Sequence, residues 1–200
     1  LIIGPAFPLR GGIANFNEAL CRTFVKLGTD SQIISFTLQY PSFLFPGKTQ
    51  FDTSGKNPEG VKITPLINSI NPLNWINVAS YIKKQKPDYV IFRFWLPFMA
   101  PCLGTIAKLI KRNTDIKIIA ICDNVIPHEK RIGDEFLTKY FVKQCDGFVA
   151  MSKAVLMDLE KISPLSLKRG VGLSRTEGRE GEASPFRFIP QPIYDIFGEK

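Results

Sequence analysis

The sequence lacks three features that would assign it to a membrane, secreted or metal-binding class. It has no apolar run of about 20 residues, the length that a transmembrane helix needs. No basic segment is followed by a cleavable apolar one, so no secretory signal is visible. Cysteines are few and scattered, with no CxxC pair, which predicts buried, reduced thiols in a cytosolic protein. They are Cys21, Cys102, Cys122 and Cys145.

Acidic residues are also in deficit, with 18 Asp and Glu against 26 Lys and Arg, and the formal net charge is +8. This surplus favours an anionic partner. The first interpretation of the basic residues is that they form a solvated protein surface, because they lie on predicted helix ends and faces. The second is a surface facing an anionic membrane. Nucleic acid ranks third, and we expect none, since no recognised nucleic-acid motif accompanies the charge.

Segments typical of strands and helices alternate along the chain. The strand-like segments are 1–4, 32–37, 61–66, 88–94, 116–122, 147–151 and, briefly, 186–189. The helix-like segments are 13–27, 73–86, 99–112, 133–144 and 153–162. This alternation predicts an α/β fold with a Rossmann-like, doubly wound parallel sheet, in which the first six strands have the order 3-2-1-4-5-6.

Three parts of the chain are expected to differ in organisation. Residues 1–162 form the Rossmann-like domain. Residues 163–185, rich in glycine and charge and without apolar periodicity, are expected to be a flexible loop. Residues 186–200 supply the last strand and the start of a linker.

The first loop, 5–12, is long and stiff for a strand-to-helix connection and ends in Gly11 and Gly12 at a helix N-terminus. Backbone at such a point binds anions or sugars, and Arg10 adds a positive charge. A tight turn without a ligand is the alternative. The loop lacks GxGxxG, and Thr37 stands where an acidic residue would end the second strand, which argues against an NAD-dependent oxidoreductase.

Two further loops follow central strands and carry polar groups. Arg93 and Trp95 end the fourth strand, where they either stack on a sugar or lipid-linked acceptor or plug the core under the next helix. Asp123 stands directly after the fifth strand, five residues before His128, the single histidine of the chain. A lone histidine is either structural or catalytic. The aromatic stretch 36–51 either covers a sheet edge or contacts an acceptor or a membrane.

Five motifs of the chain resemble the N-terminal half of a retaining glycosyltransferase of family four. They are GPAFPLRGGIANF, FRFWLPFMAP, CDNVIPHEK, DGFVAMSKAVLMDL and PQPIYDIFGE, and the likeness runs from residue 1 to about 162 and again over 186–200. These enzymes have the GT-B fold, two Rossmann-like domains that face each other across a cleft. The resemblance implies that this chain is the acceptor-side domain, without the C-terminal donor domain and inactive alone.

The resemblance also implies roles for particular residues. Gly11 and Gly12, with Arg10, would lie against the donor phosphates or the reacting sugar. Asp123 and His128 would be catalytic, although the family often has histidine where Asp123 stands. Residues 190–199 match the interdomain linker, with Gln191 in place of a common histidine. The implied acceptor-binding residues are Asn15, Arg93, Trp95, Asn124, Glu129 and Lys130.

The implied activity is transfer of a hexose, with retention, from a nucleotide-sugar to a glycan or lipid-linked acceptor. The resemblance implies no cofactor and no obligatory metal. The expected location is cytoplasmic, with peripheral attachment to the inner face of the plasma membrane as a variant. The alternative function is a solitary Rossmann-like binding module for a protein partner or an anionic membrane surface.

Overall fold

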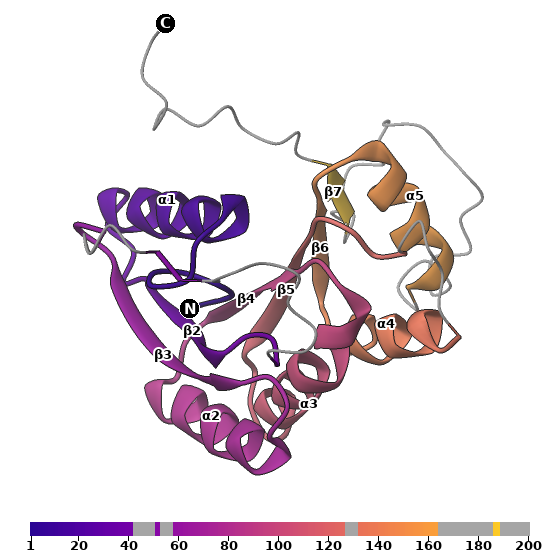
Figure 1. The fold of residues 1–200 in the computed structure, drawn as a ribbon, viewed down its shortest axis with the longest axis horizontal. Coiled ribbons are helices and arrows are strands. Elements are labelled where there is room, and N and C mark those ends of the chain that lie inside the picture. The colour runs from indigo at the N-terminus through magenta and orange to yellow at the C-terminus, as the bar shows by residue number, and fades with distance from the viewer. Residues whose placement is uncertain (42–50, 53–57, 127–131, 164–185, 189–200) are drawn as a thin grey trace, which may run out of the picture.

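The computed structural model describes residues 1–41, 51–52, 58–126, 132–163 and 186–188. Within them, seven strands form one parallel sheet in the order β3-β2-β1-β4-β5-β6-β7 (Figure 1). The strands are β1 (Ile2–Ile3), β2 (Gln32–Leu38), β3 (Lys62–Asn68), β4 (Tyr89–Phe94), β5 (Lys117–Cys122), β6 (Gly147–Ala150) and β7 (Phe186–Phe188). The predicted Rossmann-like sheet and the order of its first six strands are confirmed.

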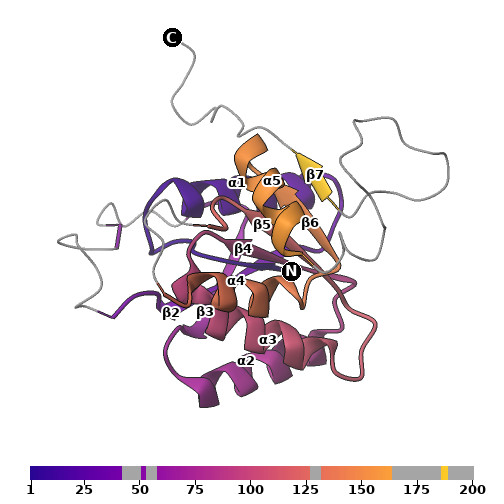
Figure 2. The same cartoon turned by 90° about the vertical axis from the view of Figure 1, so that its right-hand side faces the viewer.

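The helices cover the two faces of the sheet unequally. They are α1 (Gly12–Lys26), α2 (Pro72–Gln85), α3 (Ala100–Lys111), α4 (Asp134–Val142) and α5 (Lys153–Ile162), with a short 3-10 turn η2 (Pro97–Met99) before α3. In Figure 1, α1 lies above the sheet, while α2 and α3 lie below it, and Figure 2 shows the same separation from the side. Most of the described helical layer therefore covers one face.

Two of the helix starts, those of α2 and α5, are held by the side-chain caps that the sequence indicates. Asn71 accepts hydrogen bonds from the backbone N–H groups of Leu73 and Asn74 at the start of α2. Ser152 accepts one from Val155 at the start of α5. Such caps satisfy N–H groups that have no partner within the helix.

The larger core cluster lies on the face covered by α2, α3 and α4. Phe94 of β4 stacks on Phe141 of α4 with ring centroids 4.6 Å apart, and Phe92 meets the same ring edge-on at 5.8 Å. All four cysteines are buried and free, as predicted. Burial raises the pKa of Cys102 to about 12, which makes this thiol a poor nucleophile.

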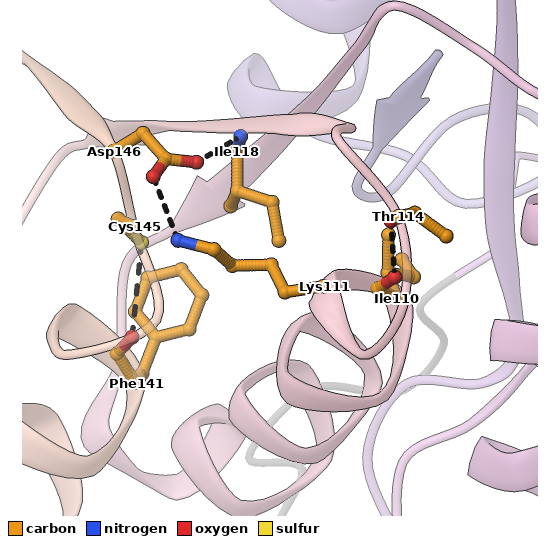
Figure 3. A network of polar contacts seen from close by, with 7 residues as sticks. All are labelled: Ile110, Lys111, Thr114, Ile118, Phe141, Cys145 and Asp146. Atoms are coloured by element: carbon orange, nitrogen blue, oxygen red, sulfur yellow. Dashed lines mark hydrogen bonds and ion pairs between the residues drawn. The ribbon is translucent and has the colours of Figure 1, made fainter.

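The C-terminal end of α3 is tied to the strands beside it. Lys111 Nζ lies 2.6 Å from Asp146 Oδ1, and the other oxygen of Asp146 accepts a hydrogen bond from the N–H of Ile118 in β5 (Figure 3). Thr114 donates back to the carbonyl of Ile110 at the same end of the helix. These contacts link α3, β5 and the residue before β6.

At one end of the described sheet lies β3, paired with β2. Pro65 stands opposite Ser35 in this pairing, and the register shifts between Ser35 and Phe36. Lys62, the first residue of β3, is exposed. In the described part of the chain, no helix is long and apolar enough to span a bilayer.

Candidate functional site

The candidate site lies where β1, β4 and β5 end. These three strands are neighbours and parallel, so the segments that follow them emerge at the same edge of the sheet. Between β1 and β4 the chain order reverses, because β2 lies on one side of β1 and β4 on the other. Sheets of this kind bind ligands at such a switch point.

Three polar side chains hold the first loop in place. The Ser35 hydroxyl of β2 accepts a hydrogen bond of 3.0 Å from the N–H of Ala6. Asn17 of α1 donates to the carbonyl of Pro5 at 2.8 Å, and Glu18 accepts from the N–H of Phe7 at 2.8 Å. These contacts were not predicted from the sequence. They fix the loop against both the sheet and its own helix.

Glu18 lies in a partly buried place. Burial raises the pKa of its carboxyl above the ordinary value, and the hydrogen bond from Phe7 acts in the opposite direction. The Glu18 carboxyl therefore accepts a hydrogen bond from the first loop while it is only partly exposed to solvent.

The glycines of the first loop differ in what they require. A Cβ at Gly4 would lie 2.5 Å from Asn17 Nδ2 and 3.0 Å from Arg93 Cβ, so packing demands glycine there. Gly11 has φ of 125°, a conformation that favours glycine. At Gly12, by contrast, φ is ordinary and a Cβ would meet no described atom within 4 Å.

Arg93 and Asp123 form a two-pronged ion pair at the ends of β4 and β5. Arg93 Nε donates to Asp123 Oδ2 at 2.5 Å, and Nη2 makes a second, very short contact with Oδ1. The arginine side chain is 1% exposed and the aspartate side chain 16%. The guanidinium carbon lies 4.1 Å from the ring centroid of Phe16 in α1, so α1 covers the pair.

Burial and pairing act in opposite directions on the Asp123 carboxyl. Burial raises its pKa, and the hydrogen bonds and charge of Arg93 lower it. The two side chains nearest Gly4, Arg93 and Asn17, each have a buried polar atom, Nη1 and Oδ1, without a hydrogen-bond partner in the described structure. Buried polar atoms without a partner are uncommon in folded proteins, which makes this part of the sheet edge a candidate functional site.

Aromatic side chains pack at the end of β4. Trp95 Nε1 donates to the Tyr40 hydroxyl at 2.5 Å, and its ring meets Phe36 edge-on at 6.2 Å. Phe98 lies 6.3 Å from Tyr40 between ring centroids. The start of the aromatic stretch 36–51 thus packs over the end of β4, and Trp95 is partly exposed there, while residues 42–50 lie outside the described residues.

The remaining predicted residues have varied positions. Arg10, Gly11, Gly12 and Asn15 are exposed at the start of α1, and Asn124 is half-buried just after β5. His128, Glu129 and Lys130 lie outside the described residues. The structure therefore brings Arg93 and Asp123 into contact and places the Gly-Gly segment on the helix whose Phe16 covers them.

One missed residue left a signal in the sequence. The buried row of α1 consists of Ala14, Asn17 and Cys21, so an amide stands in an otherwise apolar helical row. The apolar spacing of residues 13–27 predicts a buried face through Ala14, Leu20, Phe24 and Leu27, and for Leu27 this prediction is wrong. Leu27 is exposed because α1 ends at Lys26, so its side chain lies beyond the packed face.

Comparison with models of known protein families gave no match, and a search of curated proteins also found no relative. Among the described residues, no group of three or more His, Cys, Asp or Glu side chains is arranged to hold a metal ion. The fold therefore defines the class: a Rossmann-like α/β domain with a buried ion pair at its switch point.

Proposed function

We propose that this chain is the acceptor-side domain of a retaining sugar transferase. The reaction would move a hexose from a nucleotide-sugar to a glycan or lipid-linked acceptor. Support comes from the resemblance of the loop motifs and from polar residues gathered at the switch point of a Rossmann-like sheet.

The observation that carries the proposal is Gly12. Gly12 is the first residue of α1, and at a position whose backbone conformation alanine can also adopt, glycine lowers stability by about 0.4–1 kcal/mol relative to alanine. Neither a positive φ nor a crowded neighbour in the described structure requires it here, since a Cβ would meet open space. A ligand phosphate that approaches the backbone at the start of α1 would require it. Gly11 and Arg10 would belong to the same donor contact.

Asp123 would act on the reacting sugar through a fixed negative charge. Its two oxygens are oriented by Arg93, and each retains a lone pair that can accept a sugar hydroxyl. A carboxylate held in this way stabilises the positive charge that develops on a sugar ring when its anomeric bond breaks. Arg93 is then a positioning residue that acts through Asp123, and His128 is the second proposed catalytic residue.

The acceptor would contact residues from the start of α1, from the end of β4 and from the connection after β5. Asn15 and Asn124 offer amide groups, and Trp95 offers a partly exposed ring on which a sugar can stack. Glu129 and Lys130, from the same connection as His128, would complete the acceptor contact.

Gly12→Ala tests the proposal, because it should lower the rate of hexose transfer without lowering the stability of the protein. The protein is purified from its natural source and screened with radiolabelled nucleotide-hexoses and glycan or lipid-linked acceptors. We expect hexose transfer by the wild type and at least about a tenfold loss in Gly12→Ala, with a Tm that is unchanged or higher. Thr23→Ala, further along the exposed side of α1, is the matched control and should keep full transfer.

Two results would overturn the proposal. One is the absence of transfer from every nucleotide-sugar, and the other is wild-type transfer by Gly12→Ala. The 200-residue chain alone is expected to be inactive, so turnover by this chain would contradict its assignment as the acceptor-side domain alone.

A further inference from the structure

Helix α2 has apolar side chains on two opposite faces. Its inner face packs on the core through Trp75, Val78, Ala79 and Ile82. On its outer side, Leu73 is 73% exposed and Ile76 is 53% exposed. Ile70, just before the helix, is exposed as well.

The outer residues form one row along the helix. Leu73, Ile76, Ser80 and Lys84 follow one another at intervals of three or four residues, which places them on one side. An outer helix face in a globular domain is normally polar, because its apolar contacts are supplied by the inner face. Packing in the core of this domain therefore does not explain why residues 73 and 76 are apolar.

Basic side chains gather at the C-terminal ends of α2 and of its neighbour α3. Neither α2 nor α3 contains an acidic residue. Lys83 Nζ donates to the carbonyl of Arg112 at 2.8 Å, so the C-terminal ends of α2 and α3 lie side by side. The exposed cations there are Lys84, Lys86, Lys108 and Arg112. Lys111 is not among them, because it is paired with Asp146 (Figure 3).

Two other exposed apolar residues stand in a different charge environment. Phe136 of α4 shares its first turns with Asp134 and Glu135, and Met157 of α5 is followed by Asp158. On α2, by contrast, exposed aliphatic side chains coincide with a basic surplus, since the exposed Asp88 and Asp115 near the same helix ends do not balance the four exposed cations there.

We propose that the outer face of α2, together with the basic C-terminal ends of α2 and α3, docks on an anionic lipid bilayer. The aliphatic side chains would enter the interface between headgroups and acyl chains, and the lysines would lie among the headgroups. A second copy of the chain would bring the same positive charges together, which opposes self-association. Nucleic acid would match the charge but not the aliphatic row. This inference does not rest on the proposed sugar transfer.

Vesicle binding by the full 200-residue chain tests the proposal. Co-sedimentation is measured with phosphatidylcholine vesicles, with and without phosphatidylglycerol, over a range of salt concentrations. We expect binding that requires phosphatidylglycerol and weakens as salt rises. The double variant Leu73→Ser/Ile76→Ser should bind about tenfold more weakly, as should Lys84→Glu/Lys108→Glu.

The control is Met157→Ser, which removes an apolar side chain of similar exposure, 52%, from α5 and should bind as the wild type does. All substituted side chains are exposed, so circular dichroism spectra and Tm should match the wild type. Absence of binding to anionic vesicles would overturn the proposal, and so would equal binding by Leu73→Ser/Ile76→Ser. Sedimentation velocity completes the test: a dimer that this variant abolishes would assign the face to a second copy instead.

Discussion

The two sides of a single strand, β4, face different environments, one apolar and one with buried polar groups. Along β4, Val90, Phe92 and Phe94 are fully buried in the apolar layer beneath α3 and α4. Arg93, between two of these phenylalanines, lies on the other side under α1. Because side chains alternate along a strand, neighbouring residues belong to different environments.

The two environments are held together by different forces. The α3–α4 side consists of close aromatic and aliphatic contacts, whose stability follows the apolar area removed from water. The α1 side has a smaller apolar cluster around Ile2, Ile33 and Cys21, and beside it lie hydrogen bonds, a buried ion pair and atoms without partners in the described structure. The larger apolar core therefore lies on one side of the sheet, and the buried ion pair lies on the other.

The largest effect is expected for Phe141→Ala, which opens a cavity on the apolar side. The ring contacts both Phe92 and Phe94, and we expect a loss of about 4 kcal/mol in unfolding free energy. Phe136→Ala, on the same helix but exposed, is the control and should stay within about 0.5 kcal/mol of the wild type. Urea unfolding measures both, and equal losses would remove the distinction between the buried and exposed faces of α4.

The next effect concerns the ion pair on the polar side. Asp123→Leu leaves the buried Arg93 charge without its carboxylate, and we expect a loss of about 3 kcal/mol. Adding Arg93→Met should recover most of this loss, since neither charge then remains. Urea unfolding of the two single variants and the double variant gives the coupling energy. Additive losses would mean that the pair is not coupled.

Gly4→Ala should have a smaller effect, because it crowds the polar side without removing a charge. The new Cβ would press on Asn17 Nδ2 and on Arg93, and we expect a loss of about 2 kcal/mol. Thermal unfolding is the measurement, and Gly12→Ala, with no such neighbours, is the control. A loss no larger than that of the control would show that the loop can shift.

The smallest expected effect is on the pH dependence of the unfolding free energy, through the Glu18 carboxyl. Burial raises its pKa in the folded state, so above the ordinary pKa the folded protein holds more protons than the unfolded chain. Stability therefore falls as pH rises through the window between these two values. Glu18→Gln should remove this decline, as measured by urea unfolding at mildly acidic and neutral pH. Glu160→Gln, on the exposed side of α5, should leave it unchanged.

The sequence predicted the sheet because its signals are local. Apolar runs bounded by Gly, Pro and capping residues located every strand of the described sheet, and alternation with helices then fixed the strand order. The third strand extends to Asn68, beyond the predicted end at residue 66. The 3-10 turn at 97–99, directly before α3, was not predicted.

The site was only partly predictable, since its contacts depend on register and helix placement. The sequence placed Arg93 and Asp123 at strand ends, but their pairing requires the alignment of Arg93 with Ile121 and the cover of Phe16. Ser35 and Glu18 bind the first loop across gaps of 29 and 11 residues, which no local pattern reveals. Asn17 was not predicted either, although its place in an apolar row was a signal in the sequence.

The proline in β3 limits how this sheet can grow. An edge strand, which is the position of β3 in the described sheet, offers one side of its backbone to other extended chains, and this is one route to fibrils. Pro65 removes one N–H from that strand, and the register shift beside it increases the local twist. The exposed Lys62 adds a charge that an incoming strand would have to bury. The domain thus carries its own protection against aggregation at the side where its sheet would otherwise continue.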